Sequence, residues 1–271
     1  MPSSGLLVNE LALLFRRRRT WAMLLALGAV PVLIAVAVRL TSGPPNGRGP
    51  AFLDQISSNG LFTAVTGLFV CTPLFLPLTV AVVSGDTIAG EAGAGTLRYL
   101  LTAPVSRARL LAVKYAVSAV FCLSATLMIA LCGAGIGAAL FSVGPVTLLS
   151  GTTISAAAGV GRVGLIVLYM ALSLLGLAAL GLFISTLTDT PVGAMAAVAV
   201  LAVAAQILGQ LPQLEWLHPW LFTHHWLDFA DLLRDPIRWS SFGQNALLQG
   251  GYLLVFGTLA YGRLASKDIV S

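Results

Sequence analysis

The sequence predicts an all-α integral membrane protein with six transmembrane helices. Three observations indicate this fold class. Of the 271 residues, 58% are hydrophobic and only 9% are charged, mean hydropathy is +0.93, and the apolar runs are long and continuous. A soluble domain carries about 25% charged residues, a spanning helix needs about 20 apolar residues, and a membrane β-barrel would show short alternating segments. The predicted spans cover residues 21–40, 61–84, 110–140, 163–186, 191–211 and 246–261.

Residues 1–20 predict an amphipathic helix that lies on the inner membrane surface. Leucine and phenylalanine side chains recur there at helical spacing, and the polar residues fall off that stripe. Four arginines follow the stripe: Arg16, Arg17, Arg18 and Arg19. The alternative is a basic topology signal behind a frayed leader. We expect the span at 21–40 to be retained, because it has a span-length core and no small-residue cleavage site.

The distribution of lysine and arginine predicts the orientation of the chain. With the N-terminus inside, ten basic residues lie on the inner side and five on the outer side. Basic residues near span ends favour the cytoplasm, so we expect a multi-pass protein of the cytoplasmic (inner) membrane with both termini cytoplasmic. The net charge of +5 then reflects topology and contact with the lipid bilayer, and nucleic acid is excluded as a partner.

The outer segment at 212–245 predicts short helices at the membrane interface. It holds four of the five tryptophans, Trp216, Trp220, Trp226 and Trp239, and amphipathic aromatic residues prefer the headgroup level. All three histidines also lie there, and histidine is a common ligand of transition metals, so a metal site in this segment is conceivable. No cysteine joins the histidines, so we expect no metal site.

Polar residues are densest at 85–109, between the second and third spans, which places this segment in the cytoplasm. Its GEAGAGT stretch lacks the lysine that a phosphate-binding loop requires after the last glycine, since Thr96 and Leu97 follow Gly95. The following residues predict a short helix at 96–101, a turn at 103–104, and a helix start capped by Ser106. Such a stub, tied to two spans, is suited to passing force.

This segment resembles the cytoplasmic loop of the type 2 ATP-binding-cassette (ABC) exporter permeases. That loop has an acidic residue, Gly-Thr, a leucine-rich turn, Pro-hydrophobic-Ser and a basic residue before the third span. The matching positions are Glu91, Gly95, Thr96, Leu97, Arg98, Leu100, Leu101, Pro104, Val105, Ser106, Arg107 and Lys114. The six-span plan and the Arg-x-x-x-Lys-Asp tail also fit. One departure is the single acid in EAGAG, where the family usually has two or three charges.

The resemblance implies a permease that works with two separate cytosolic ABC ATPase subunits and a second permease subunit, identical or related. ATP and Mg would be used by the ATPase, and this chain would bind no cofactor and catalyse no reaction. The coupling residues it implies are Glu91, Gly95, Thr96, Leu97, Arg98, Leu100, Pro104, Ser106 and Arg107. The complex would export an amphipathic or hydrophobic compound, such as a drug, an antibiotic or a lipid-like molecule.

The spans themselves contain almost no ionisable residues, which argues against a transporter driven by an ion gradient. Gly133 and Gly137 form a G-x-x-x-G pattern that predicts close helix packing, and Pro73 and Pro77 predict a kink in the second span. No arrangement suited to catalysis is visible. The alternative function is an ATP-independent membrane channel or scaffold protein.

Overall fold

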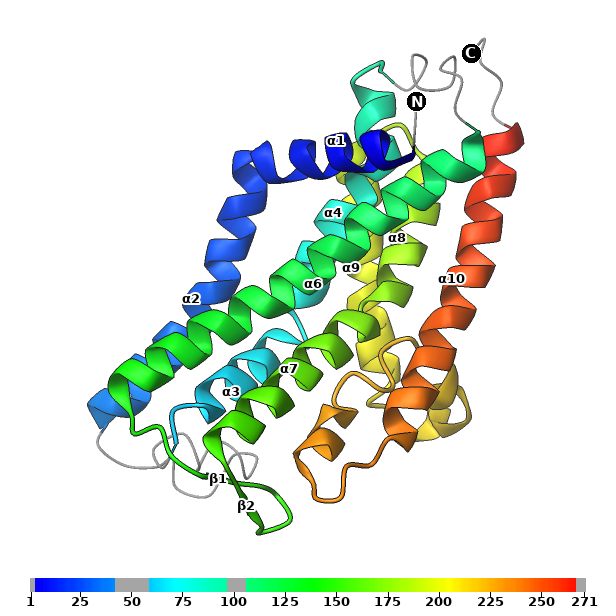
Figure 1. Ribbon diagram of the computed structural model, residues 1–271. Helices are drawn as coiled ribbons and strands as arrows, with labels where there is room; N and C mark the ends of the chain where they lie inside the picture. Colours follow the sequence, from blue (N-terminus) through cyan, green and yellow to red (C-terminus); the bar gives the residue numbers. More distant parts are fainter. Residues whose placement is uncertain (1–2, 42–58, 97–105, 267–271) are drawn as a thin grey trace.

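The computed structural model describes residues 3–41, 59–96 and 106–266. In these parts the chain forms a bundle of helices with one small hairpin (Figure 1). Its helices are α1 Ser3–Arg16, α2 Arg18–Thr41, α3 Phe62–Cys71, α4 Phe75–Gly93, α6 Arg107–Leu140, α7 Ala156–Ser173, α8 Leu175–Leu187, α9 Pro191–Leu208, η1 Pro212–Trp220, η2 Asp228–Leu233 and α10 Ser240–Ser266. Its strands are β1 Val146–Thr147 and β2 Thr153–Ile154, which pair antiparallel. The all-α prediction therefore missed this hairpin.

Helix α1 lies across one end of the bundle, where α10 also ends (Figure 1). We call this the α1 end, and we call the opposite end, which carries the hairpin, η1 and η2, the loop end. The turn from α1 into α2 is closed by two side chains of α2: Thr20 Oγ1 donates to the Leu14 carbonyl at 2.7 Å, and Trp21 Nε1 donates to the Phe15 carbonyl at 2.8 Å. These bonds satisfy carbonyl groups that the end of α1 leaves without helix partners.

The apolar stripe of α1 packs on the bundle. Leu14 is buried, and Leu7, Leu11 and Phe15 lie against the main core. The predicted amphipathic helix is confirmed as a helix over Ser3–Arg16, and its apolar face covers protein. The predicted range of 1–20 was too long, because α2 already begins at Arg18.

Four helices are long and apolar enough to cross a membrane, namely Arg18–Leu40, Arg107–Leu140, Ala156–Leu187 and Pro191–Leu208. The bent pair α3 and α4 makes a fifth if it is counted as one span. Within the described residues α10 does not meet the same criterion, because Gln244, Asn245 and Gln249 lower the apolar character of its first half. The count of six spans therefore remains a prediction.

The predicted kink in the second span is confirmed. Helices α3 and α4 are bent by 59° at the break after Cys71. Pro73 lies in this break, and Pro77 lies four residues later, where a helix would need an N–H to bond the Pro73 carbonyl. Proline has no N–H, and the side chain of Gln206 in α9 donates to that carbonyl instead. Helix α4 then continues to Gly93, well past the predicted span end at residue 84.

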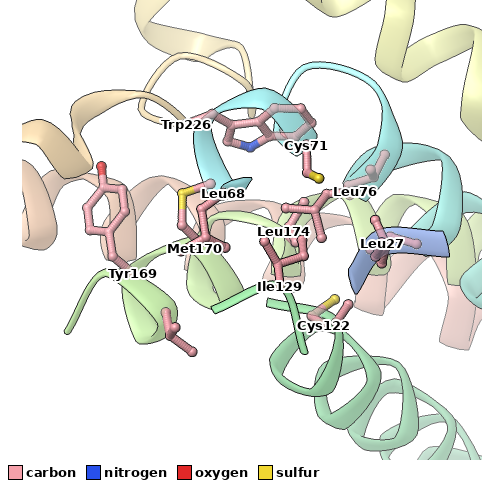
Figure 2. Packing of buried hydrophobic residues seen from close by; sticks show 14 of the residues in the cluster. Leu27, Leu68, Cys71, Leu76, Cys122, Ile129, Tyr169, Met170, Leu174 and Trp226 are labelled. Carbon is pink, nitrogen blue, oxygen red and sulfur yellow. The ribbon is translucent and has the colours of Figure 1, made fainter. Parts of the chain in front are cut away.

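The main core lies between α2, α3, α4, α6 and α7 and extends under the loop-end segments. Figure 2 shows a part of this core, with side chains of α2, α3, α6 and α7 that include Leu27, Leu68, Ile129 and Met170. The cysteines are free, and Cys71 and Cys122 are fully buried. A buried thiol behaves as a small hydrophobic group, so these two cysteines serve as packing residues of the core.

The G-x-x-x-G pattern packs α6 against the start of α3 within the same subunit. A Cβ atom at Gly133 would lie 2.6 Å from the Ala64 Cα, and one at Gly137 would overlap the carbonyl of Gly60. Backbone atoms, which cannot move aside cheaply, thus require glycine at both positions.

The short helices predicted within 212–245 are present as η1 and η2, and their position at the membrane interface stays a prediction. Trp216, Trp220 and Trp239 are exposed, as expected for interfacial residues. The prediction was wrong for Trp226, which is only 2% exposed and donates to the Ser173 carbonyl at 2.9 Å. It belongs to the core (Figure 2).

Candidate coupling site at the α1 end

The end of α4 explains why glycine and threonine follow the acidic residue. Gly95 has φ of +71°, a backbone conformation that favours glycine. Its N–H bonds the Ala92 carbonyl at 3.0 Å, and the Thr96 N–H bonds the Glu91 carbonyl at 2.9 Å. These two bonds form a Schellman motif, which stops a helix and satisfies its last carbonyls. The GEAGAGT stretch is therefore the end of a helix. This agrees with the absence of the lysine that a phosphate-binding loop requires after the last glycine.

After residues 97–105, which lie outside the described part of the chain, the structure resumes at Ser106. This residue is the N-cap of α6, and its Oγ accepts a hydrogen bond from the Arg109 N–H at 3.4 Å. The capped start is confirmed. The remaining predicted coupling residues, Leu97, Arg98, Leu100 and Pro104, lie outside the described residues, as does most of the short helix predicted at 96–101.

Glu91 faces the inside of the subunit. Its Oε1 bonds the Nζ of Lys114 in α6, and the same ammonium donates to Oε2 of Glu10 in α1 at 2.9 Å. The Lys114 side chain is only 5% exposed, against 12% for Glu10 and 19% for Glu91. One nearly buried cation thus joins three helices through two carboxylates.

Asp86, five residues before Glu91 on α4, forms a second charged contact. Its Oδ2 accepts from Arg17 at 2.6 Å and also from Arg19. Of the four arginines predicted to mark the interfacial helix, these two bind the protein, and Arg16 and Arg18 are exposed. The second contact attaches α4 to the turn between α1 and α2.

The two contacts lie side by side and together form what we call the coupling cluster. A small cavity of about 40 Å³ is lined by residues of both contacts. The cluster consists of Glu10, Arg17, Arg19, Asp86, Glu91 and Lys114. Three acidic and three basic groups give it no formal net charge. Lys114, at 5% exposure, is the most buried member of this cluster, and removing the cation of a buried ion pair leaves an uncompensated charge, which typically costs about 3–5 kcal/mol.

Two further contacts attach the same region to the rest of the bundle. Arg107, at the start of α6, donates to the carbonyl oxygens of Leu264 and Ala265 at the end of α10, where the helix dipole favours a cation. Ser185 of α8 accepts from the N–H groups of Ile88 and Ala89 and donates to the Gly85 carbonyl at 2.7 Å. The Ser185 hydroxyl thereby bonds three backbone groups of α4 and holds α8 against that helix.

Both helix ends that flank the polar segment are therefore fixed to the bundle. Glu91 joins the end of α4 to α1 and α6 through Lys114, and Arg107 joins the start of α6 to the end of α10. Among the described residues, no group of three or more His, Cys, Asp or Glu side chains is arranged to hold a metal ion.

The chain matches one protein family along nearly its whole length. The sequence model of the family described as "ABC-2 family transporter protein" matches residues 6–268. No curated protein matches the chain. With the apolar helices described above, this match makes the chain a multi-pass membrane protein of the type that serves as an ABC transporter permease and normally pairs with ATPase subunits. The protein belongs to the ABC-2 transporter family.

Proposed function

We propose that this chain is the permease subunit of an ATP-driven exporter in the cytoplasmic membrane, with both termini in the cytoplasm. Two cytosolic ATPase subunits bind the α1 end, and a second permease, identical or related, completes the membrane part. The cargo is an amphipathic or hydrophobic compound that moves outward. The observation that carries this proposal is the coupling cluster, because it joins the end of α4, from which the polar segment continues, to α1, α2 and α6.

In this mechanism ATP and Mg are used by the partner, and this chain receives only movement. Closure of the ATPase around ATP displaces the segment between Glu91 and Arg107. The Schellman end at Gly95 and the cap at Ser106 keep the described parts of this segment short and stiff. Lys114 then carries the displacement from α4 to α1 and α6, because its ammonium is bonded to carboxylates on both sides.

The assignment of an apolar cargo rests on the near absence of charge in the spans. At the bend between α3 and α4 there is a cavity of about 140 Å³, lined in part by Thr72, Gln206 and Thr223. Among the described residues, the lining of this cavity offers hydroxyl and amide groups and the imidazole of His224, and it includes no lysine, arginine, aspartate or glutamate. A charged solute would have to leave water without a compensating partner there, which is costly.

The experiment that tests this function is isolation of the tagged chain from its native membrane followed by an assay of ATP hydrolysis. We expect a protein with a G-x-x-x-x-G-K-[ST] motif to co-purify in stoichiometric amount and to hydrolyse ATP. In vesicles loaded with candidate amphipathic dyes, Glu91→Gln should lower the number of dye molecules moved per ATP. Glu215→Gln is the matched control, since Glu215 is an exposed carboxylate at the loop end. Absence of an ATPase, together with transport that needs no ATP, would favour the alternative function, an ATP-independent membrane channel.

A further inference from the structure

A large open groove lies along the exposed side of α10 at the loop end, far from the coupling cluster. Its volume is about 630 Å³. Its rim at the loop end is formed by Trp220 and His225 of the loop-end segments and by Gln244 of α10. Further along α10, towards the α1 end, the groove is lined by Leu247, Gly251 and Val255. Helix α10 runs at the edge of the bundle in Figure 1, and the side chains of Leu247 and Val255 on this side of the helix are exposed.

The groove changes from polar to apolar along its length. The His225 Nδ1 bonds the Asp228 carboxylate at 2.7 Å at the polar rim, and Trp220, which is 71% exposed, marks the headgroup level. Leu247 is 78% exposed and Val255 is 54% exposed further along the helix. The rise from Gln244 to Val255 is roughly 16 Å in an α-helix, which matches half of the approximately 30 Å hydrocarbon layer.

The groove owes its depth to a glycine. A Cβ at Gly251 would meet no heavy atom within 4 Å, and the same is true at Gly250. Gly251 lines the groove and Gly250 does not. The bed of the groove is therefore bare backbone of α10, flanked by the ring of Tyr252, whose hydroxyl donates to the Trp220 carbonyl at 2.8 Å. That bond fixes the wall of the groove to its rim.

We propose that this groove binds one acyl chain of a membrane phospholipid from the leaflet at the loop end, with the headgroup at the rim formed by Trp220, His225 and Gln244. The occupant has to be long and apolar, because the lower part of the groove lies at hydrocarbon depth. It also needs a polar end, because the rim presents an imidazole and an amide. A phospholipid has both properties and surrounds the protein at high concentration. The site rests on the membrane location of the chain and does not depend on coupling to an ATPase.

The test is photolabelling of the complete protein complex in vesicles of phosphatidylethanolamine and phosphatidylglycerol. The vesicles contain a trace of phosphatidylcholine with a diazirine in one acyl chain, and labelled peptides are found by mass spectrometry. We expect label at Leu247 and Val255. Gly251→Leu should reduce that label several-fold by filling the groove, and Val255→Trp should do the same from further along the helix. Gly250→Leu is the matched control and should keep the wild-type label.

Three results would overturn the proposal. The first is equal labelling of Gly251→Leu and Gly250→Leu. The second is label spread evenly over all of α10, which would indicate ordinary lipid contact. The third is efficient disulfide crosslinking between two copies of a Leu247→Cys variant, which would show that protein covers the groove. None of these results bears on whether an ATPase drives transport, so the proposed function would stand apart from them.

Discussion

Replacing Lys114 by methionine is the sharpest perturbation of the coupling cluster. Methionine keeps most of the length and volume of lysine but removes the ammonium, so the change isolates the charge. The carboxylates of Glu10 and Glu91 then face each other without a cation between them. Both carboxylates retain some contact with solvent, at 12% and 19% exposure, so the expected loss lies near the lower end of the range for a broken buried ion pair, about 3 kcal/mol.

The assay is thermal unfolding of the purified protein in detergent. For a chain of this size about 1 kcal/mol corresponds to roughly 2–4 °C, so Lys114→Met should lower Tm by about 6–12 °C. A double variant in which Glu91→Gln is added removes one of the two repelling charges and should recover much of that loss, because the two sites are in direct contact. A Tm of Lys114→Met equal to wild type, or a double variant whose losses simply add, would refute the reasoning.

Other variants test single features of the structure. Gly95→Ala forces a side chain into the left-handed conformation and should cost about 1 kcal/mol, seen as a lower Tm; an unchanged Tm would contradict the helix-end geometry. Gly133→Ala pushes a methyl group against backbone and should cost about 1–3 kcal/mol, while Gly135→Ala, at an open position, should be tolerated in the same melt. Gln249→Leu leaves buried backbone groups unpaired at about 1–3 kcal/mol, and an equally stable variant would show that water replaces the amide. Arg98→Glu should insert normally, and the complex that contains it should hydrolyse ATP at its ATPase subunits without transport; wild-type transport would remove Arg98 from the coupling role.

The apolar pattern and the prolines predicted much of the bundle. Continuous hydrophobic runs are a local property, and they placed α2, α6 and α9 close to where they lie. The bend at Pro73 was predictable because proline acts on its own helix. Gly133 and Gly137 also indicated close packing, although the sequence left open whether the neighbour was the same subunit or a second one.

The coupling cluster could be predicted only in part, because its bonds join distant positions. Glu10 and Lys114 are 104 residues apart along the chain, and no local pattern links them. The family resemblance assigned Glu91 to contact with an ATPase, and nothing in the neighbouring sequence indicated a partner for it inside the subunit. The signal that could have corrected this was Lys114 itself, a lysine so close to the third span that burial required a carboxylate nearby.

Trp226 was misplaced, and α10 begins at Ser240, before the predicted span start at residue 246, for a related reason. Trp226 lies in the same segment as the exposed tryptophans, and only the fold shows that its indole reaches the Ser173 carbonyl. Two of the three amides that weaken the apolar signal of α10 are satisfied inside the protein, since Asn245 donates to the Ser173 Oγ at 2.7 Å and Gln249 donates to the Phe222 carbonyl at 3.0 Å. Hydropathy counts these amides as polar and cannot count their partners.

The central claim is that work from an ATPase enters at the segment that follows α4. The most direct measurement is photocrosslinking of the native complex with a photoreactive amino acid at Thr96, at the α1 end, or at Val143, which is exposed towards the loop end. We predict that Thr96 crosslinks to the co-purified ATPase subunit, that the yield changes when ATP is added, and that Val143 gives no such product. A crosslink at Val143 and none at Thr96, with or without ATP, would contradict the account.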